Sequence, residues 1–256
     1  SETNVWLLTR VPDGVTPYAN RGWPFFEKGV ASMITEGASV LDLGKLSGDV
    51  LGWLSLAKQC AVARQPPLGP DKFIQILKEK KFTNNGDHLE VAKMYLESFT
   101  KAVRSAKILE FPDLGWGDTE IECVADILPY CSELDEILLD ANEFGHRGAK
   151  ALASALPHCH GLKKIVLHKC KIGVAGISAI AKALPLLSGI RELHLQNNDI
   201  GPDKEDIAIP ALIAALEVVT NIYLMDLSAN DLNAEQQSQL RSAWSAAGKH
   251  VPNLWL

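Results

Sequence analysis

The segment from Leu134 to Gly145 reads LDEILLDANEFG, and its pattern of apolar and small polar positions repeats through the second half of the chain. Counting 28 residues forward gives LKKIVLHKCKIG from Leu162, and a further 28 gives IRELHLQNNDIG from Ile190. A weaker copy, AKILEFPDLGWG, begins at Ala106, and the last copy, IYLMDLSANDLN, begins at Ile222 after a spacing of 32. Five copies in one register predict an array of repeated structural units.

Each copy predicts a short strand followed by a helix. Anchors such as Ile137 and Leu139 are expected to point into the core, while the residues between them face outward. Asn142 occupies a polar position that turns the chain and can bond backbone groups of its neighbours. Cys170 keeps the small size and a weak donor at the equivalent position, whereas Leu114 in the first copy does not. Helical spacing follows the strands at 149–156, 177–184 and 211–218.

A 28-residue unit with a full helix resembles the ribonuclease-inhibitor class of leucine-rich repeat proteins, over about residues 106–232. The resemblance implies an α/β fold, a right-handed solenoid with parallel strands inside and helices outside. A small α/β and helical region is expected to precede it. The expected parts of this domain, 87–256, are a capping helix at 87–105, repeats from about 106, 134, 162, 190 and 222, an insertion around 202–206 and a C-terminal cap at 233–256.

Residues 1–86 do not repeat and are expected to form a partial α/β domain with a helical connector. The segments 5–9 and 39–44 are β-prone, and 21–34 between them predicts a helix. The order strand, helix, strand indicates a parallel unit. The proline-rich segment 64–70 predicts a stiff connector between the two parts of the chain, followed by a helix at 71–80.

Three motifs in this region carry a second resemblance: RGWPFFE at 21–27, LDLGKL at 41–46 and FTNNGD at 82–87. They resemble the C-terminal half of an α/β domain of algal and other protist proteins, itself distantly similar to heterokaryon-incompatibility and TIR signalling domains. The resemblance covers roughly residues 3–105. It implies a signalling role, but the strand and helix that precede these motifs in such proteins are not in this sequence, so we do not expect NAD chemistry here.

Composition and charge exclude several classes of protein. The formal net charge of −6 and a pI near 5.7, without a concentrated basic segment, argue against a nucleic-acid partner. No apolar stretch has the roughly 18 to 20 residues that a membrane-spanning helix needs. Five cysteines at spacings that fit neither disulfides nor zinc predict reduced, buried thiols and an intracellular protein, cytoplasmic or, as the alternative, organellar.

The sequence offers few candidates for catalysis or metal binding. His158, Cys159 and His160 are adjacent in the sequence, but a zinc site needs four ligands that converge on the ion. The repeat does not bring four such residues together, because Cys170 occupies its polar position. Glu27 has no histidine or second acid placed beside it, so a structural role is expected. We therefore predict a protein that is not an enzyme, with no metal and no cofactor.

The residues between the strand anchors are the candidate binding site, because they face the concave side of the predicted solenoid. Leu138 and Val166 form an apolar centre with charged residues around it, as in a partner site. A solvated sheet face with alternating charges would also account for Glu136, Lys164 and Glu192. The candidate site residues are Glu136, Leu138, Asp140, Lys164, Val166, His168, Glu192, His194, Gln196 and Asp226.

Three functions remain open from the sequence. The first is a non-catalytic interaction module that binds a protein or peptide on the concave face. The second is a structural or accessory subunit of a larger assembly, held by its N-terminal part and the exposed edges of the array. The third is a fragment of a TIR- or heterokaryon-incompatibility-like signalling protein.

Overall fold

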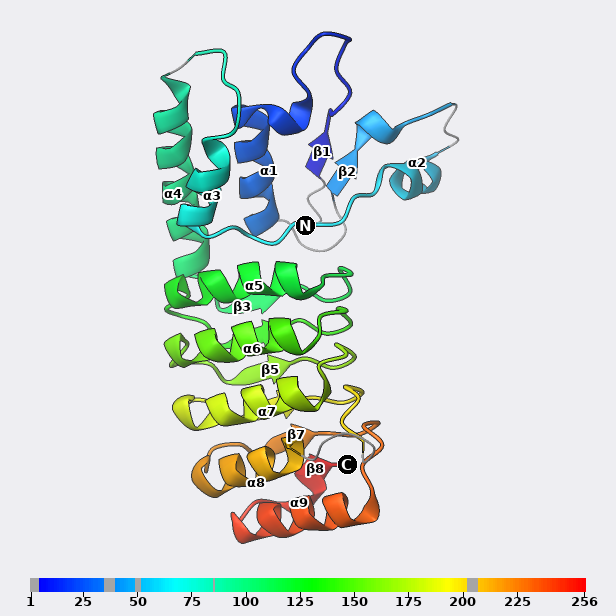
Figure 1. The fold of residues 1–256 in the computed structure, drawn as a ribbon, viewed down its shortest axis with the longest axis vertical. Helices are drawn as coiled ribbons and strands as arrows, with labels where there is room; N and C mark the ends of the chain where they lie inside the picture. Colours follow the sequence, from blue (N-terminus) through cyan, green and yellow to red (C-terminus); the bar gives the residue numbers. More distant parts are fainter. Residues whose placement is uncertain (1–4, 35–39, 49–51, 85, 202–206) are drawn as a thin grey trace. The chain divides into compact units, whose positions relative to one another are not determined.

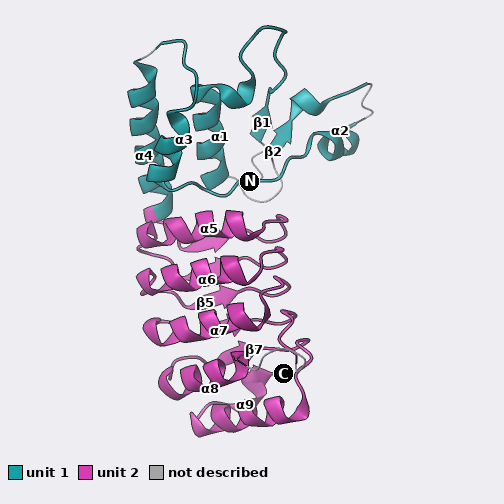
Figure 2. Ribbon diagram, in the orientation of Figure 1, with its two compact units in different colours: residues 1–103 teal, residues 104–256 magenta. Residues whose placement is uncertain are grey.

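A computed structural model describes residues 5–34, 40–48, 52–84, 86–201 and 207–256 of the chain. These residues form two compact units, residues 1–103 and residues 104–256 (Figure 2). The first unit contains a two-stranded sheet and the second a six-stranded sheet, and both sheets are parallel. The predicted α/β class, with parallel strands, is confirmed.

The sheet of the second unit follows the chain order without any crossover, from β3 to β8. One strand comes from each predicted copy, and the sixth follows the last copy. The pairing keeps the spacing of the sequence repeat, since Ile137 lies beside Ile165 and Ile165 beside Leu193. The strands are β3 Ile108–Glu110, β4 Glu136–Leu138, β5 Lys164–Val166, β6 Glu192–His194, β7 Leu224–Asp226 and β8 Leu254–Trp255.

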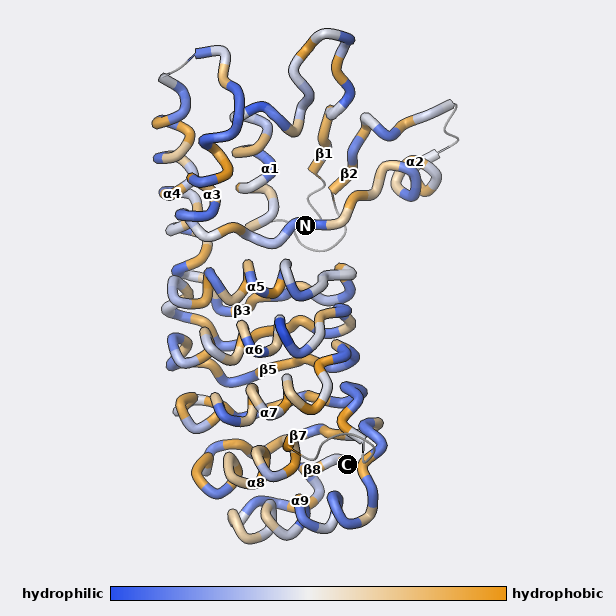
Figure 3. Tube along the Cα trace, in the orientation of Figure 1, coloured by the Kyte–Doolittle hydropathy of each residue, from blue (hydrophilic) through white to orange (hydrophobic). Residues whose placement is uncertain are grey.

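Five helices of this unit lie side by side and alternate with the strands along the chain (Figure 1). They pack closely: a Cβ on Gly176 of α7 would lie 2.9 Å from the Cβ of Ala149 in α6. The most apolar of them, α8, is drawn mainly in orange and tan in Figure 3. The helices are α5 Asp118–Ile127, α6 His146–Ala155, α7 Gly173–Ala183, α8 Ala208–Val218 and α9 Ala234–Ala246.

Two details of the helical segments differ from the prediction. The helices α6 and α7 begin several residues before the predicted starts at 149 and 177. Pro157 and Pro185 do not simply follow the helices, because each lies inside a 3₁₀ turn, Leu156–His158 and Leu184–Leu186. Proline suits the start of such a turn, where no intrahelical N–H bond is needed. The predicted insertion around 202–206 lies outside the described residues.

Buried asparagines join successive copies, as the sequence predicted. The Asn198 side chain donates to the carbonyl oxygens of Leu167 and Leu195 at 2.8 and 3.0 Å. Its Oδ1 accepts from the backbone N–H groups of Cys170 and Ile172 at 3.0 and 3.3 Å. Asn142, two copies before Asn198, and Asn230, one copy after it, make the same kind of bonds.

Cys170 occupies the asparagine position of the third copy and replaces only part of the network. Its Sγ lies 3.3 Å from the carbonyl oxygens of Leu139 and His168, so it supplies the weak donor that the sequence predicted. The single sulfur atom has to serve as both weak donor and weak acceptor, whereas asparagine has a separate amide donor and carbonyl acceptor. The third copy is therefore held to its neighbours by weaker hydrogen bonds than the copies that contain asparagine.

A left-handed residue follows each strand at the same place in every copy. Their φ angles lie between 50° and 56° at Asp113, Ala141, Lys169, Asn197 and Ala229. Such angles are unfavourable for residues other than glycine, by about 1 kcal/mol each. Asp113, Ala141, Lys169 and Asn197 donate ladder hydrogen bonds, for example Ala141 N to His168 O at 2.9 Å, that hold the conformation in place.

The first unit pairs β1 (Val5–Leu7) with β2 (Val40–Asp42) in parallel, and α1 (Gly22–Ile34) connects them. This order confirms the predicted parallel strand–helix–strand unit. Three more helices follow in the chain: α2 (Trp53–Cys60), α3 (Pro70–Leu77) and α4 (Asp87–Arg104). Helix α2 was not among the helices predicted from the sequence.

Stacked aromatic rings form the centre of the first unit. Phe73 of α3 lies between Phe25 of α1 and Tyr95 of α4, with ring centroids 4.7 and 3.4 Å away. The Tyr95 hydroxyl donates to the Leu68 carbonyl at 2.8 Å. Because these contacts bury one side of α4, this helix belongs to the first unit, whereas the prediction grouped residues 87–105 with the repeats. Its role as a cap remains a prediction.

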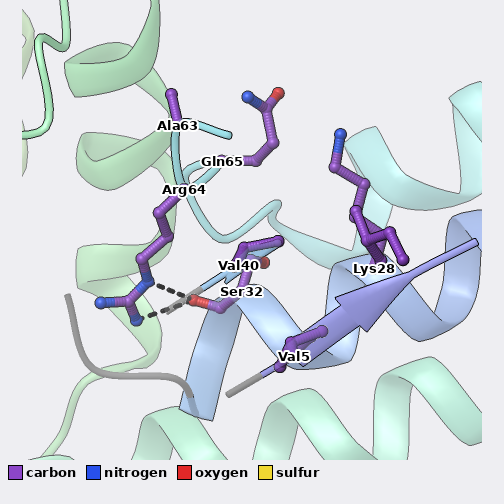
Figure 4. Close-up of a pocket in the computed structure, with 9 residues that line it drawn as sticks. Val5, Lys28, Ser32, Val40, Ala63, Arg64 and Gln65 are labelled. Atoms are coloured by element: carbon purple, nitrogen blue, oxygen red, sulfur yellow. Dashed lines mark hydrogen bonds between the residues drawn. The ribbon is translucent and has the colours of Figure 1, made fainter. Parts of the chain in front are cut away.

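The segment 64–70 is not a linker between the two units, because it packs inside the first one. Arg64 is 5% exposed, and its Nε and Nη2 donate to the Ser32 carbonyl of α1 at 3.1 and 2.8 Å (Figure 4). Burial lowers the pKa of Lys28, which lines the same small hollow between β1, β2 and α1. The hollow has room for about one water molecule.

All five cysteines are buried and free in the structure. Burial raises the pKa of Cys131 to about 12, of Cys159 to about 11 and of Cys170 to about 12. Thiols are reactive as thiolates, so these side chains should be inert while the chain is folded. We expect Ellman's reagent at pH 8 to leave them unmodified in the native protein and to titrate five thiols in guanidinium chloride. Fast labelling of the native chain would contradict this burial.

The same pKa shifts predict how the stability of the fold depends on pH. Because the pKa of each thiol is raised in the folded state, its contribution to stability is complete below the unfolded pKa near 9. That contribution should be lost as the pH rises through the range between 9 and the folded values. The free energy of unfolding, measured in urea at pH 7 and pH 10, should therefore be lower at pH 10.

Candidate functional site

The side chains that alternate with the buried anchors form one face of the six-stranded sheet, which we call the open face. The described helices of the second unit pack on the opposite face (Figure 1). The first column across the strands is Ile108, Glu136, Lys164, Glu192 and Leu224. The second column is Glu110, Leu138, Val166, His194, Asp226 and Trp255. The third column, just after the strands, is Pro112, Asp140, His168, Gln196 and Ser228.

All ten predicted site residues lie on the open face, within adjacent columns. Their side chains differ in how much of their area is exposed to solvent. Leu138 is half-buried and Val166 is 9% exposed, so the apolar centre offers less area than the sequence suggested. Asp226 is 4% exposed, and its Oδ1 accepts from the backbone N–H and the hydroxyl of Ser228 at 2.9 and 2.7 Å. This carboxylate oxygen is committed to the turn that follows β7.

Glu192 is the most connected side chain of the first column. The Tyr223 hydroxyl donates to its Oε1, while Lys164 Nζ and His194 Nε2 lie 3.7 and 3.5 Å from its Oε2. The hydrogen bond from Tyr223 holds the pKa of Glu192 below its usual value, and Lys164 adds to the effect. Glu192 is therefore a carboxylate at neutral pH. The 3.5 Å approach of His194 is an electrostatic contact and not a hydrogen bond.

The third column contains a row of polar side chains on neighbouring copies. His168 Nε2 lies 3.8 Å from Asp140 Oδ2, which is too far for a hydrogen bond. His168 Nδ1 and Gln196 Oε1 are buried atoms without a hydrogen-bond partner among the described residues. His194 Nε2 in the second column is in the same state. The three unpartnered polar atoms thus belong to β6 and to the segments that follow β5 and β6.

Two aromatic residues of this region were missed by the sequence analysis. Trp255 of β8 extends the second column beside Asp226 and is 52% exposed. Tyr223 precedes β7, donates to Glu192 and lines an open hollow with Ser188, Arg191 and Asn221. Continuing the repeat register past the last copy would have placed Trp255 on the face. Tyr223 aligns with Arg191, one residue before the first column.

The other sequence candidates do not form a site. His158 and His160 are exposed, whereas Cys159 is buried, so the three side chains do not converge. Within the described ranges, no group of three or more histidine, cysteine or acidic side chains is placed to hold a metal ion. In the same residues, no helix is long and apolar enough to cross a membrane.

Comparisons with known proteins give little beyond these observations. No protein-family model matches the chain, and no curated protein matches it. A solved structure titled "Leiomodin-1 Actin-Binding Site 2 (ABS2)" matches with a TM-score of 0.48 and 14% sequence identity. The match covers 60% of this chain and 87% of that chain. A likeness of this size carries no argument about function, so the role of the chain is argued below from its own residues.

Proposed function

We propose that the second unit is a leucine-rich repeat solenoid of the ribonuclease-inhibitor type that binds a protein or peptide on the open face and has no catalytic activity. The constant register of the strands and the buried asparagines that join the copies support the repeat architecture. Such arrays stack neighbouring repeats and use one extended face for binding.

The observation that carries the proposal is the composition of the open face. Leu138 and Val166 are flanked by the charged first column and by the polar third column. A small apolar centre with a polar rim is the usual arrangement of a protein interface.

A triple variant tests the proposal: Glu136→Lys, Leu138→Asp and Lys164→Glu. Lys164 lies between Glu136 and Glu192 in the first column, so the reversals change the local field while the formal net charge changes only by −1. We expect at least a 100-fold loss of affinity for a partner captured by the wild-type chain, because the change lies at the centre of the face. Isothermal calorimetry with the purified partner measures it, and circular dichroism checks the fold.

A matched control makes the same chemical changes away from the open face. Lys182→Glu, Leu186→Asp and Glu217→Lys alter three exposed residues on the helical side, Leu186 being 59% exposed. This variant should bind like the wild type. Full affinity of the open-face variant, or equal loss in both variants, would overturn the proposal.

A structural subunit is the second candidate, and exposed apolar residues of the first unit favour it. Trp6 and Trp53 are each 50% exposed, with ring centroids 6.0 Å apart, and the neighbouring Leu54 is 84% exposed. Exposed apolar clusters of this kind mark interaction surfaces. This function predicts that the chain purifies from its source in fixed stoichiometry with a larger assembly, and that Trp6→Ser with Trp53→Ser releases it.

A further inference from the structure

We infer that the open hollow beside Tyr223 binds the carboxylate of an acidic residue in the segment that occupies the open face. This inference rests on the proposed function and specifies one contact of the partner. The hollow has a volume of about 350 Å³ and lies where the chain enters β6 and β7. We call it the Arg191 hollow, and its lining residues are Ser188, Gly189, Arg191, Asn221 and Tyr223.

Arg191 belongs to a row of residues that directly precede the strands of successive copies. Backbone hydrogen bonds of 2.7–2.9 Å join neighbouring members of this row. Lys163 Nζ pairs with Asp135 Oδ1 at 2.9 Å. The hydrogen bond from Lys163 lowers the pKa of Asp135, and the charge of Lys107 adds to the effect. The one acid of the row therefore already serves two cations, and Arg191 has the basic Lys163 on one side and the uncharged Tyr223 on the other.

No other carboxylate of the described residues lies within 4 Å of the Arg191 guanidinium. Glu192 is next to it in the sequence, but Glu192 accepts a hydrogen bond from Tyr223 and lies 3.7 Å from Lys164 Nζ. The hydrogen bond to Glu192 raises the pKa of Tyr223, and the charge of Arg191 partly opposes this rise. The guanidinium thus lies near the Tyr223 hydroxyl and places a positive charge without a counter-ion at the hollow.

Hydrogen bonds fix the walls of the Arg191 hollow. Asn221 Nδ2 donates to the Ser188 carbonyl at 2.8 Å, which ties the segment before β7 to the segment before β6. The Tyr223 hydroxyl is held by Glu192 of the first column, so the hollow adjoins the open face. A side-chain amide has two N–H donors, and Asn221 uses one of them on Ser188. The second donor is available to a ligand beside the guanidinium.

A carboxylate matches this arrangement better than other groups. A guanidinium binds a carboxylate through two parallel N–H···O bonds, and one positive charge balances one negative charge. A phosphate with two charges needs a second cation, but Lys163 is committed to Asp135. Pockets for small molecules are mostly apolar and bury most of their ligand, whereas this hollow is open and lined mainly by polar residues. A side chain that belongs to a longer bound segment is therefore the favoured ligand.

The charge of the open face restricts the acidic residue to one position of the partner. Lys164 is the basic residue of the three columns, and it already lies beside Glu192. The acidic residues of the columns are Glu110, Glu136, Asp140, Glu192 and Asp226. Since like charges across an interface are unfavourable, acidic residues elsewhere in the segment would be repelled. The inference predicts a single acidic position and not a generally acidic partner.

Selection from a phage-displayed library of random 12-residue peptides on the full chain tests the inference. Peptides are kept when the open-face triple variant of the preceding section fails to bind them. We expect the aligned face-dependent peptides to share one position occupied by aspartate or glutamate. Face-dependent peptides without such a position overturn the inference and leave the proposed function in place. If no face-dependent peptide is found, both fail.

A double-mutant cycle then locates the acidic residue. One selected peptide and its form with glutamine or asparagine at the acidic position are measured against the wild-type chain and Arg191→Gln by fluorescence anisotropy. We expect each single change to weaken binding at least fivefold and the two together to weaken it no further. Arg241→Gln, which makes the same change on the exposed side of α9, should bind like the wild type.

Two results would contradict this assignment. If the losses from the peptide change and from Arg191→Gln are additive, the acidic residue contacts another part of the chain. If a peptide with phosphoserine at the acidic position binds more tightly than the carboxylate peptide, the hollow selects a doubly charged group and the carboxylate assignment is wrong.

Discussion

Replacing Asn198 by alanine is expected to lower the free energy of unfolding by about 4 kcal/mol and the melting temperature by about 10 °C. The side chain is completely buried and bonds the backbone of the preceding copy and of its own copy through four hydrogen bonds at 2.8–3.3 Å. Alanine leaves these backbone donors and acceptors buried and unpaired, which costs far more than the loss of one exposed bond. Denaturation in guanidinium chloride, followed by circular dichroism, measures the change.

Asn221→Ala is the matched control, because it removes the same kind of side chain from an exposed position. Asn221 Nδ2 makes one hydrogen bond, to the Ser188 carbonyl at 2.8 Å, in contact with solvent. The control should lose less than about 1 kcal/mol. Cys170→Ala should lie between the two, since its Sγ is a weak donor and a weak acceptor, whereas the Asn198 amide is strong in both roles. A loss for Asn198→Ala as small as the control would mean that the buried asparagines do not hold the copies together.

The repeat period made the second unit predictable from sequence. A constant spacing between apolar anchors determines which residues are buried, and Ile137, Ile165 and Leu193 are all completely buried at equivalent positions. The same period assigns the alternate residues to the open face, because side chains along a strand alternate between its two faces. Asn142 and Asn198 were predictable for a related reason: a polar residue at a buried, repeating position must find backbone partners.

The exposure, pKa and backbone conformation of individual residues depend on contacts that the repeat spacing does not determine. His194 and Asp226 share a column, but Asp226 is withdrawn from the surface by its bonds to Ser228. Glu192 acquires a lowered pKa from Tyr223, a residue outside the three columns. The left-handed turns at Ala141 and Lys169 also lack a sequence signal, because neither alanine nor lysine favours a positive φ.

The first unit shows why a non-repeating segment is harder to predict. Prolines in the segment 64–70 predicted a stiff connector between the two parts of the chain, but they carried no information on burial, and Arg64 is inserted against α1. Burial there depends on contacts with residues more than 30 positions earlier, such as Ser32. The helix α2 is short, at eight residues, and its exposed Trp53 and Leu54 weaken the apolar periodicity that would indicate a helix.

Truncation of Trp244 to alanine is expected to lower the free energy of unfolding by about 4 kcal/mol, the range for a buried aromatic residue in a core. Trp244 of α9 is completely buried, and its Nε1 donates to the His250 carbonyl at 2.9 Å. Lys249 lies over the ring at 5.6 Å from its centroid and donates to the carbonyl oxygens of Val219, Thr220 and Ile222 at 2.8–3.0 Å. The tryptophan therefore holds the end of the last helix against the copy before it.

Trp255→Ala provides the control for this change, because it removes the same side chain from a residue that is 52% exposed on the open face. It should cost less than about 1 kcal/mol. Hydrogen exchange followed by mass spectrometry should show that Trp244→Ala reduces protection first in α9 and β8, because an end repeat has a neighbour on one side only. A uniform loss of protection across β3 to β8 would show instead that the array unfolds as a single unit and that α9 does not act as a local cap.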